Sequence, residues 1–307
     1  MPIKRKLYRS GFLHVCQKSA DNGILFYTIE DILVIYTVLS VKSIDFHVVI
    51  CALDIMFNHL HIGAFVESME IMSKFMNSST SVFAKIYNRR YGLKGQLFKK
   101  PFKSAPKMSE GKIRDCLFYI WNNPKEKKAV KSAEDYRWNF LKYMESDHPF
   151  SEPVDATSVS DILLKQMKKV KAKHEVGEYL DYAFFDNVNN TLSRDERLQL
   201  IDYVIVIYNP IRHDAVLEKF GSFQSLVLAI NSVTGNEYEL SDDNDNEDYR
   251  HYLQMISIVR REGIDLDHIR FNRKYFENNE RLLARLQGLF KKEVGASDYE
   301  IAKFLHL

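Results

Sequence analysis

The sequence contains little cysteine. Its three cysteines, Cys16, Cys51 and Cys116, are far apart, and each lies among apolar residues. A disulfide framework in a secreted domain uses more cysteines at closer spacing, so these three are expected to be reduced side chains in a core. The cysteine usage therefore indicates a cytoplasmic protein.

Long apolar runs are also lacking. The most apolar stretch, residues 24–41, is interrupted by two acidic residues and is not expected to span a membrane. The basic start of the chain lacks the apolar core of a signal peptide. The acidic stretch 241–248 lacks the glycine and the final glutamate of a calcium-binding loop, so we expect a solvated surface loop there.

Charge is divided unevenly along the 307 residues. Residues 1–150 contain 23 Lys and Arg against 14 Asp and Glu, whereas the remainder contains 20 against 27. This asymmetry favours nucleic acid as the partner of the N-terminal half. The alternative is a solvated surface whose charge is merely uneven. The length favours two domains.

The order of the expected elements predicts the fold class of the first half. The expected strand-helix-strand-strand-helix-strand order predicts an α+β fold. Thr28 and Ser68 are the expected helix N-caps. The expected elements are strands at 11–19 and near 102, a hairpin at 47–66, and helices at 29–43, at 69–91 and from 109 to just before Pro124.

His59 and His61 lie in the second strand of the hairpin. Because side chains at i and i+2 of a strand share a face, both imidazoles are expected on one side of the sheet, with Leu60 and Ile62 against a core on the other. Neutral imidazoles are common metal ligands, so the pair predicts half of a metal site on a solvent-facing surface. The alternative is a pair of half-buried strand histidines without a metal.

Residues 88–104 combine positive charge with aromatic rings. Lys and Arg side chains meet phosphates and rings stack on bases, and unpaired DNA requires both from a protein that binds it. The alternative is a solvated basic loop. The expected DNA-binding residues are Arg89, Arg90, Tyr91, Lys94, Lys99, Lys100, Phe102 and Lys103.

Blocks within residues 11–140 resemble one family, in the right order. The family is the single-tyrosine His-hydrophobic-His transposases, in particular the REP-associated tyrosine transposases. Two residues depart from its pattern, because Phe57 stands where a proline is usual and Lys18 where an arginine is usual. The similar blocks are His14-Val15, Met56-Phe57-Asn58-His59-Leu60-His61, Tyr119-Ile120-x-x-Asn123-Pro124 and Asp135-Tyr136-x-Trp138.

The resemblance implies a fold, an activity and a site. The implied fold is ferredoxin-like, an antiparallel sheet with helices on one face and the histidine strand at its centre. The implied activity is that of a metal-dependent single-strand DNA endonuclease and strand transferase, acting in DNA transposition and recombination at or near hairpins. Tyr119 would be the nucleophile and form a 5′-phosphotyrosine, with Tyr136 as the competing candidate. His59, His61 and Asn123 would hold Mg²⁺ or Mn²⁺, whereas zinc suits imidazoles but lacks a third strong ligand.

The composition changes after the first half. We expect a transposase-like nuclease domain at 1–147, a polar linker at 148–160 and a mainly α-helical domain at 161–307. The tail, 281–307, resembles a helix-turn-helix whose recognition helix is missing, or a unit that only packs. The expected partner is single-stranded or hairpin DNA, with no membrane, and the chain is expected to be a monomer or a homodimer. The alternative function is a DNA-binding structural or regulatory protein that keeps the fold without transposing.

Overall fold

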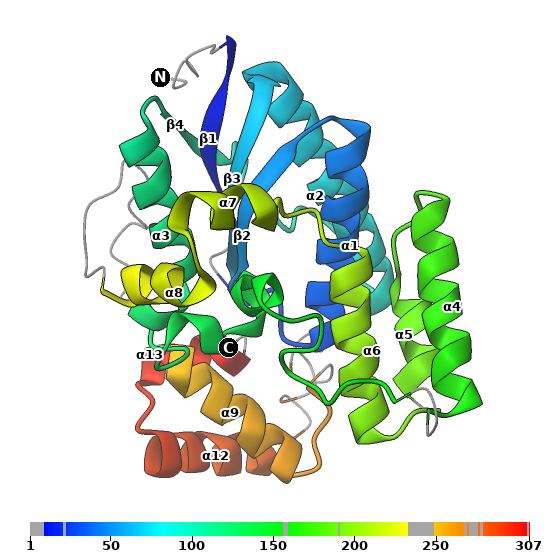
Figure 1. Ribbon diagram of the computed structural model, residues 1–307. Coiled ribbons are helices and arrows are strands. Elements are labelled where there is room, and N and C mark those ends of the chain that lie inside the picture. The colour runs from blue at the N-terminus through cyan, green and yellow to red at the C-terminus, as the bar shows by residue number, and fades with distance from the viewer. Residues whose placement is uncertain are drawn as a thin grey trace.

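Four strands form one antiparallel sheet in the computed structural model (Figure 1). Their order is β2-β3-β1-β4, so the histidine strand β3 and the first strand β1 form the central pair. The α+β class and the expected order of strands and helices are confirmed. The strands are β1 Arg9–Lys18, β2 Val49–Ile55, β3 His59–Ser68 and β4 Lys103–Lys107. The structure describes residues 9–20, 23–155, 159–189, 191–232, 249–266, 269, 276, 279–305 and 307.

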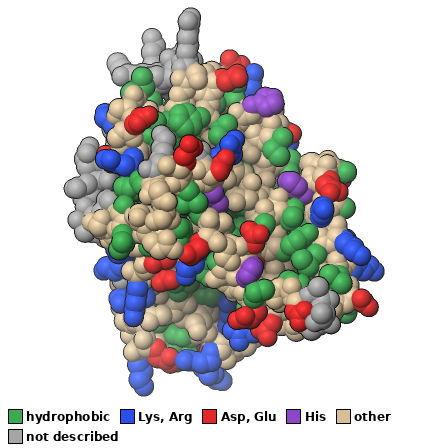
Figure 2. Space-filling model, in the orientation of Figure 1, with side chains coloured by type: hydrophobic (Ala, Val, Ile, Leu, Met, Phe, Trp, Pro, Cys, Tyr) green, Lys and Arg blue, Asp and Glu red, His purple; other side chains and the backbone are tan. Residues whose placement is uncertain are grey.

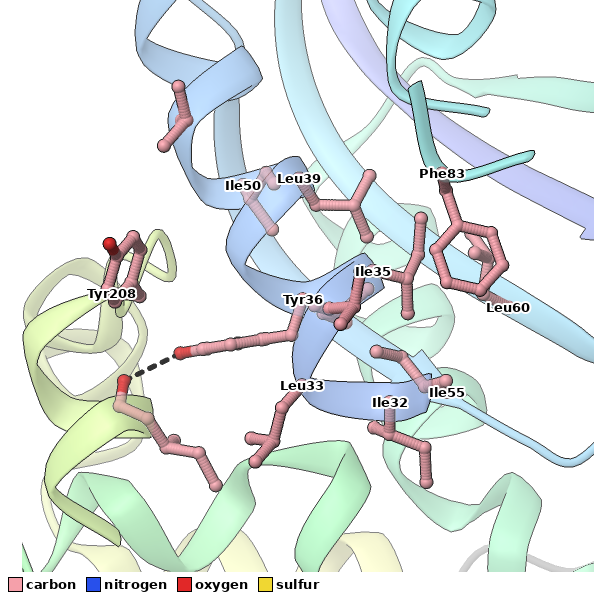
Figure 3. Packing of buried hydrophobic residues seen from close by; sticks show 14 of the residues in the cluster. Ile32, Leu33, Ile35, Tyr36, Leu39, Ile50, Ile55, Leu60, Phe83 and Tyr208 are labelled. Atoms are coloured by element: carbon pink, nitrogen blue, oxygen red, sulfur yellow. Dashed lines mark hydrogen bonds between the residues drawn. The ribbon is translucent and has the colours of Figure 1, made fainter. Parts of the chain in front are cut away.

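Two helices, α1 (Ile29–Asp45) and α2 (Met69–Tyr91), pack over one face of the sheet. Thr28 caps α1 through a capping box, and Ser68 caps α2, as expected. Figure 3 shows the core under α1, where apolar side chains of this helix meet those of the sheet and α2. This core fixes the face of β3 that Leu60 and Ile62 occupy, and thereby the opposite face for the histidines.

A third helix, α3 (Glu110–Glu126), packs against β2, β3 and β4. Its partners there belong to the other face of the sheet, so the expectation of helices on one face only is wrong. The expected end of α3 before Pro124 is also wrong. The missing N–H of Pro124 removes one helical hydrogen bond, but residues 116–124 are buried, and this packing holds the last turn in place.

The helices after residue 160 pack on the elements of the first half. Tyr36 of α1 donates a hydrogen bond of 2.8 Å to the backbone carbonyl of Ile205 in α6 (Figure 3). At the hairpin turn, residues 56 and 57 share an apolar cluster with α9, α12 and α13. In α13, Phe304 accepts a hydrogen bond from the Tyr27 hydroxyl through its backbone carbonyl, so this tail helix packs on the body of the protein. The acidic stretch 241–248 lies outside the described residues.

The remaining helices complete the chain (Figure 1). Three short 3-10 turns follow α3, and a short π-helix follows α12. Their bounds are η1 Ala133–Asp135, η2 Arg137–Asn139, η3 Leu141–Met144, α4 Asp161–Glu175, α5 Tyr182–Asn189, α6 Arg194–Ile207, α7 His213–Phe220, α8 Phe223–Ser232, α9 Tyr249–Arg261, α12 Glu280–Leu289, η4 Phe290–Val294 and α13 Asp298–Leu305.

The three cysteines are buried and form no disulfide, as the sequence predicts. Within the described residues, no helix combines the length and the apolar character that crossing a membrane requires.

Candidate functional site

The two histidines of β3 stand on the same face, as the strand period predicts. Their ring centroids are 4.9 Å apart, and the rings are nearly perpendicular. Contrary to the expectation of a solvent-facing pair, His59 is 3% exposed and His61 is fully buried. The reason is α3, whose apolar side covers this face, together with the helices that cover the hairpin turn.

His59 is held from both ring nitrogens. Its Nδ1 lies 2.7 Å from Asn58 Oδ1, and the same amide oxygen accepts a hydrogen bond of 2.6 Å from the Tyr249 hydroxyl. On the other side of the ring, Nε2 lies 3.4 Å from the Asn123 amide nitrogen. The ring is therefore fixed between the hairpin turn and α3.

His61 meets a third histidine. Its Nδ1 lies 3.0 Å from Nε2 of His14, a fully buried residue of β1. The Tyr119 ring lies 5.5 Å from each of these two imidazoles, measured between ring centroids. In the sequence, His14 stands out only as part of a strand that resembles the family. Its even spacing from the other residues of β1 that face α3 is the signal that could have placed it in the site.

Tyr119 and Asn123 come from successive turns of α3 and reach the two histidines of β3. Their i,i+4 spacing puts them on one side of the helix. Close approach of α3 to the sheet depends on Gly63, since a Cβ there would lie 2.9 Å from the Phe12 ring and 3.0 Å from Ile120 Cδ1. The glycine thus leaves the room in which the tyrosine, the amide and the imidazoles meet.

Asp54 is a functional candidate that the sequence analysis did not identify. It is fully buried in β2, opposite His61, and its Oδ2 accepts a hydrogen bond of 2.9 Å from the Asn123 amide nitrogen. A lone carboxylate within the apolar strand 49–55, two residues from an expected turn, is the signal that could have found it. In this arrangement the amide nitrogen of Asn123, and not its oxygen, points toward His59 and Asp54.

A divalent cation fits this site only in part. In the described portion of the chain, no three His, Cys, Asp or Glu side chains are arranged to hold a metal ion. Two imidazoles and an amide oxygen form a weak donor set for Mg²⁺ or Mn²⁺, which take oxygen ligands and retain waters. The Asn123 amide must also turn its oxygen toward His59. Phosphate oxygens of a substrate are the ligands that such a set lacks.

The hydroxyl of Tyr136, the competing candidate nucleophile, is hydrogen-bonded to the backbone of β2. Its hydroxyl donates a hydrogen bond of 2.9 Å to the backbone carbonyl of Ile55. Burial, and to a smaller degree the nearby Asp54 carboxylate, raise the pKa of Tyr136 well above its ordinary value. A phenol with a raised pKa is a poorer nucleophile at neutral pH, which disfavours Tyr136 as the nucleophile.

The expected DNA-binding segment divides into exposed cations and internal side chains. Phe102 is only 6% exposed and belongs to the core, and the hydroxyl of the half-buried Tyr91 donates to Asp31 at 2.9 Å. The Phe102 ring is therefore not exposed for base stacking, and the Tyr91 ring also contacts Tyr87 and Tyr182. Arg90 forms a two-pronged ion pair with Asp186, with distances of 2.6 and 3.0 Å. Besides Arg90, the exposed cations are Arg89, Lys94, Lys99, Lys100 and Lys103.

This basic segment lies beside the end of β1, the strand that pairs with the histidine strand. The backbone N–H of Lys99 donates to the carbonyl of Lys18 at 2.9 Å, and Lys18 is the register partner of His59. Residues that are directly opposite on antiparallel strands share a face, so the Lys18 side chain is on the same side of the sheet as His59. The backbone of Lys99 is therefore next to the residue of β1 that pairs with His59.

Comparison with known proteins gives little. No family model matches the chain, and no curated protein matches it. Among solved structures, one of a REP-associated tyrosine transposase bound to a REP hairpin is 16% identical, covering 52% of this chain and 95% of that one with a TM-score of 0.41. A likeness this slight carries no argument about function, which has to come from the site itself.

Proposed function

We propose that the protein is a DNA-processing enzyme, a transposase-like single-strand endonuclease and strand transferase with Tyr119 as its nucleophile. One observation carries the proposal: Tyr119 and Asn123, one turn apart on α3, reach His61 and His59 on β3. The sequence resemblance names the same four residues from motifs that are about 60 positions apart in the chain. We also assign the sheet order β2-β3-β1-β4 to a ferredoxin-like fold.

Tyr119 performs the covalent step in this proposal. Its phenol oxygen attacks the scissile phosphorus, the new bond from oxygen to phosphorus forms, and the bond from phosphorus to the 3′ oxygen breaks. The phenol proton ends on the departing 3′ oxygen. The products are a 5′-phosphotyrosine and a free 3′-hydroxyl, and attack by another 3′-hydroxyl on the phosphotyrosine rejoins the strand.

The residues around Tyr119 orient the reacting groups. His59, His61 and Asn123 would hold Mg²⁺ or Mn²⁺, and such an ion, when bound, polarises the phosphate. His14 fixes the position of the His61 ring, whereas the Asn123 amide, which donates to Asp54, must turn its oxygen toward such an ion. The low dielectric of the buried site strengthens each of these interactions.

The substrate in this proposal is single-stranded or hairpin DNA. Exposed Lys94, Lys99, Lys100 and Lys103 would contact the phosphates beside the site. Because Tyr119 is only 8% exposed, a DNA phosphate reaches the phenol only when the elements that cover the site separate. DNA entry therefore requires movement of α3 or of the C-terminal helices. The acting protein is a monomer or a homodimer in this proposal.

Burial of the site favours a second candidate function. The hydrogen bonds between His14 and His61 and between His59 Nδ1 and the accepting Asn58 Oδ1 tie the sheet together internally, and they suit a structural role. In this alternative the protein binds DNA through its basic segment as a structural or regulatory factor, without transposing.

A covalent-capture assay separates the two functions. The full chain is incubated with labelled single-stranded hairpins and Mn²⁺, and the products are resolved under denaturing conditions. The enzyme gives a labelled protein–DNA adduct that chelation with EDTA prevents. Binding without any adduct, over a broad hairpin library, identifies the DNA-binding alternative.

A further inference from the structure

The hairpin turn before His59 is covered by the C-terminal half of the protein. Phe57, which stands where the resembled family has a proline, lies with its ring centroid 5.4 Å from that of Tyr249 at the start of α9. Both side chains are buried in the cluster that α9, α12 and α13 form. The aromatic residue at position 57 thus provides the packing surface on which α9 rests.

Tyr249 also makes a polar contact in the same place. Its hydroxyl donates to Asn58 Oδ1 at 2.6 Å, and that oxygen lies 2.7 Å from His59 Nδ1. An amide oxygen has two lone pairs, and so it can accept from both the phenol O–H and an imidazole N–H. The three side chains form a chain of hydrogen bonds from α9 to the histidine strand, although Tyr249 and Asn58 are 191 residues apart.

The donor and acceptor roles in these hydrogen bonds decide which ring nitrogen of His59 carries the proton. In a neutral imidazole one nitrogen has the proton and the other has a lone pair, and the hydrogen bond at one nitrogen sets which is which. With Asn58 Oδ1 as the acceptor, Nδ1 carries the proton. The lone pair of His59 is then at Nε2, on the side of Asn123, which is 3.4 Å away.

We propose that Tyr249 is a positioning residue for the candidate site. Its hydroxyl holds the Asn58 amide oxygen toward His59, which fixes the Nδ1–H tautomer and keeps the Nε2 lone pair directed into the site. The tautomer is a property of the folded protein. Only the role of the lone pair as a ligand of Mg²⁺ or Mn²⁺ rests on the proposed function. The C-terminal half therefore completes the candidate site rather than only accompanying it.

Nuclear magnetic resonance measures the tautomer directly. The full-length protein is labelled with ¹⁵N-histidine, and two-bond correlations are recorded at a pH where the imidazoles are neutral, with His59→Gln identifying the resonances. Wild-type His59 is expected to show the Nδ1–H pattern. Tyr249→Phe keeps the ring beside Phe57 but removes the donor, so His59 is expected to shift to a mixture containing Nε2–H.

Two matched variants separate positioning from packing. Tyr252→Phe alters another buried hydroxyl on α9 and is expected to leave the His59 pattern unchanged. In Asn58→Asp the side chain has two acceptor oxygens and no amide N–H, so it presents an acceptor to His59 whichever way it turns. The double variant Asn58→Asp with Tyr249→Phe is therefore expected to restore the Nδ1–H pattern.

Affinity for Mn²⁺, followed by relaxation of the His59 resonances, is expected to fall about tenfold in Tyr249→Phe. An Nε2–H wild type, or an unchanged tautomer in folded Tyr249→Phe, would overturn the positioning role. A tautomer that shifts as expected, in a protein with no Mn²⁺ affinity and no DNA adduct, would retain the positioning role while removing the proposed enzyme.

Discussion

At the scale of single residues, the molecule places titratable groups out of water. Asp54, His14 and His61 are fully buried near one another, and half-buried His213 lies at the start of α7. Burial penalises the charged form of a side chain, so such groups are held by neighbours or change their protonation. The consequence that is measured most readily concerns His213, which lies outside the candidate site.

His213 makes the stability of the protein fall in mild acid. Burial lowers its pKa to about 4, whereas an unfolded histidine titrates near 6.5. The unfolded chain therefore binds the proton first, and stability is lost as the pH falls from about 6.5 toward 4. At pH 5 the loss relative to pH 7 is about 2 kcal/mol.

Urea unfolding at the two pH values, with His213→Gln beside the wild type, measures this contribution. The difference between the two proteins isolates His213 from the carboxylates that also titrate. An equal pH dependence in both proteins would contradict the lowered pKa.

At the scale of elements, the site depends on how closely α3 approaches the sheet. Gly63 is the point of closest approach, and Tyr119 is adjacent to Ile120, which the added Cβ would meet. A change there moves the nucleophile relative to the imidazoles without removing any site residue.

Gly63→Ala is expected to destabilise the protein by about 2 kcal/mol, because the buried Phe12 ring and Ile120 must shift to admit the methyl group. Gly11→Ala is the matched control on the neighbouring strand, where no atom lies within 4 Å of the added Cβ. Thermal unfolding of both variants is the measurement. Equal stability of the two variants would mean that a methyl group at position 63 fits between the sheet and α3 without displacing either.

The sequence predicted local features of these elements better than distant ones. Thr28 and Ser68 cap the expected helices because capping depends on residues a few positions apart. The facing of His59 and His61 followed from the strand period alone. Their burial did not, because it depends on α3 and on α9, and no local pattern encodes a contact such as that between Tyr249 and Asn58. Asp54 was missed for the same reason, since its partner Asn123 is 69 residues away.

At the scale of the whole molecule, the basic side chains lie in more than one region of the surface. Figure 2 shows one face of the molecule with basic side chains gathered at its lower end, in the region where Figure 1 places α9 and α12. Several cations of this C-terminal region are in ion pairs, among them Arg261 with Glu293 and Arg285 with Glu262. The proposed DNA phosphate contacts are instead the exposed lysines of residues 94–103.

Replacing Lys94, Lys99, Lys100 and Lys103 with Gln is expected to weaken binding of a single-stranded hairpin and to flatten its salt dependence. Each lost contact with a single strand lowers the slope of log K against log salt by about 0.7, so four contacts lower it by about 3. Lys165, Lys168 and Lys169, which are exposed on α4, are the control set for the same substitution. Fluorescence anisotropy over a salt series measures both. An unchanged slope in the first variant would place the DNA elsewhere.

Peptide mapping of the trapped protein–DNA adduct by mass spectrometry identifies the nucleophile. The wild-type protein is expected to carry the nucleotide on Tyr119. Tyr119→Phe is expected to form no adduct while keeping its hairpin affinity, because the ring stays and only the attacking oxygen is lost. Tyr136→Phe removes the hydrogen bond to Ile55, with a cost of about 1 kcal/mol in stability, and is expected to form the adduct at a normal rate. Nucleotide found on Tyr136, or on any residue outside α3, would contradict the assignment of Tyr119.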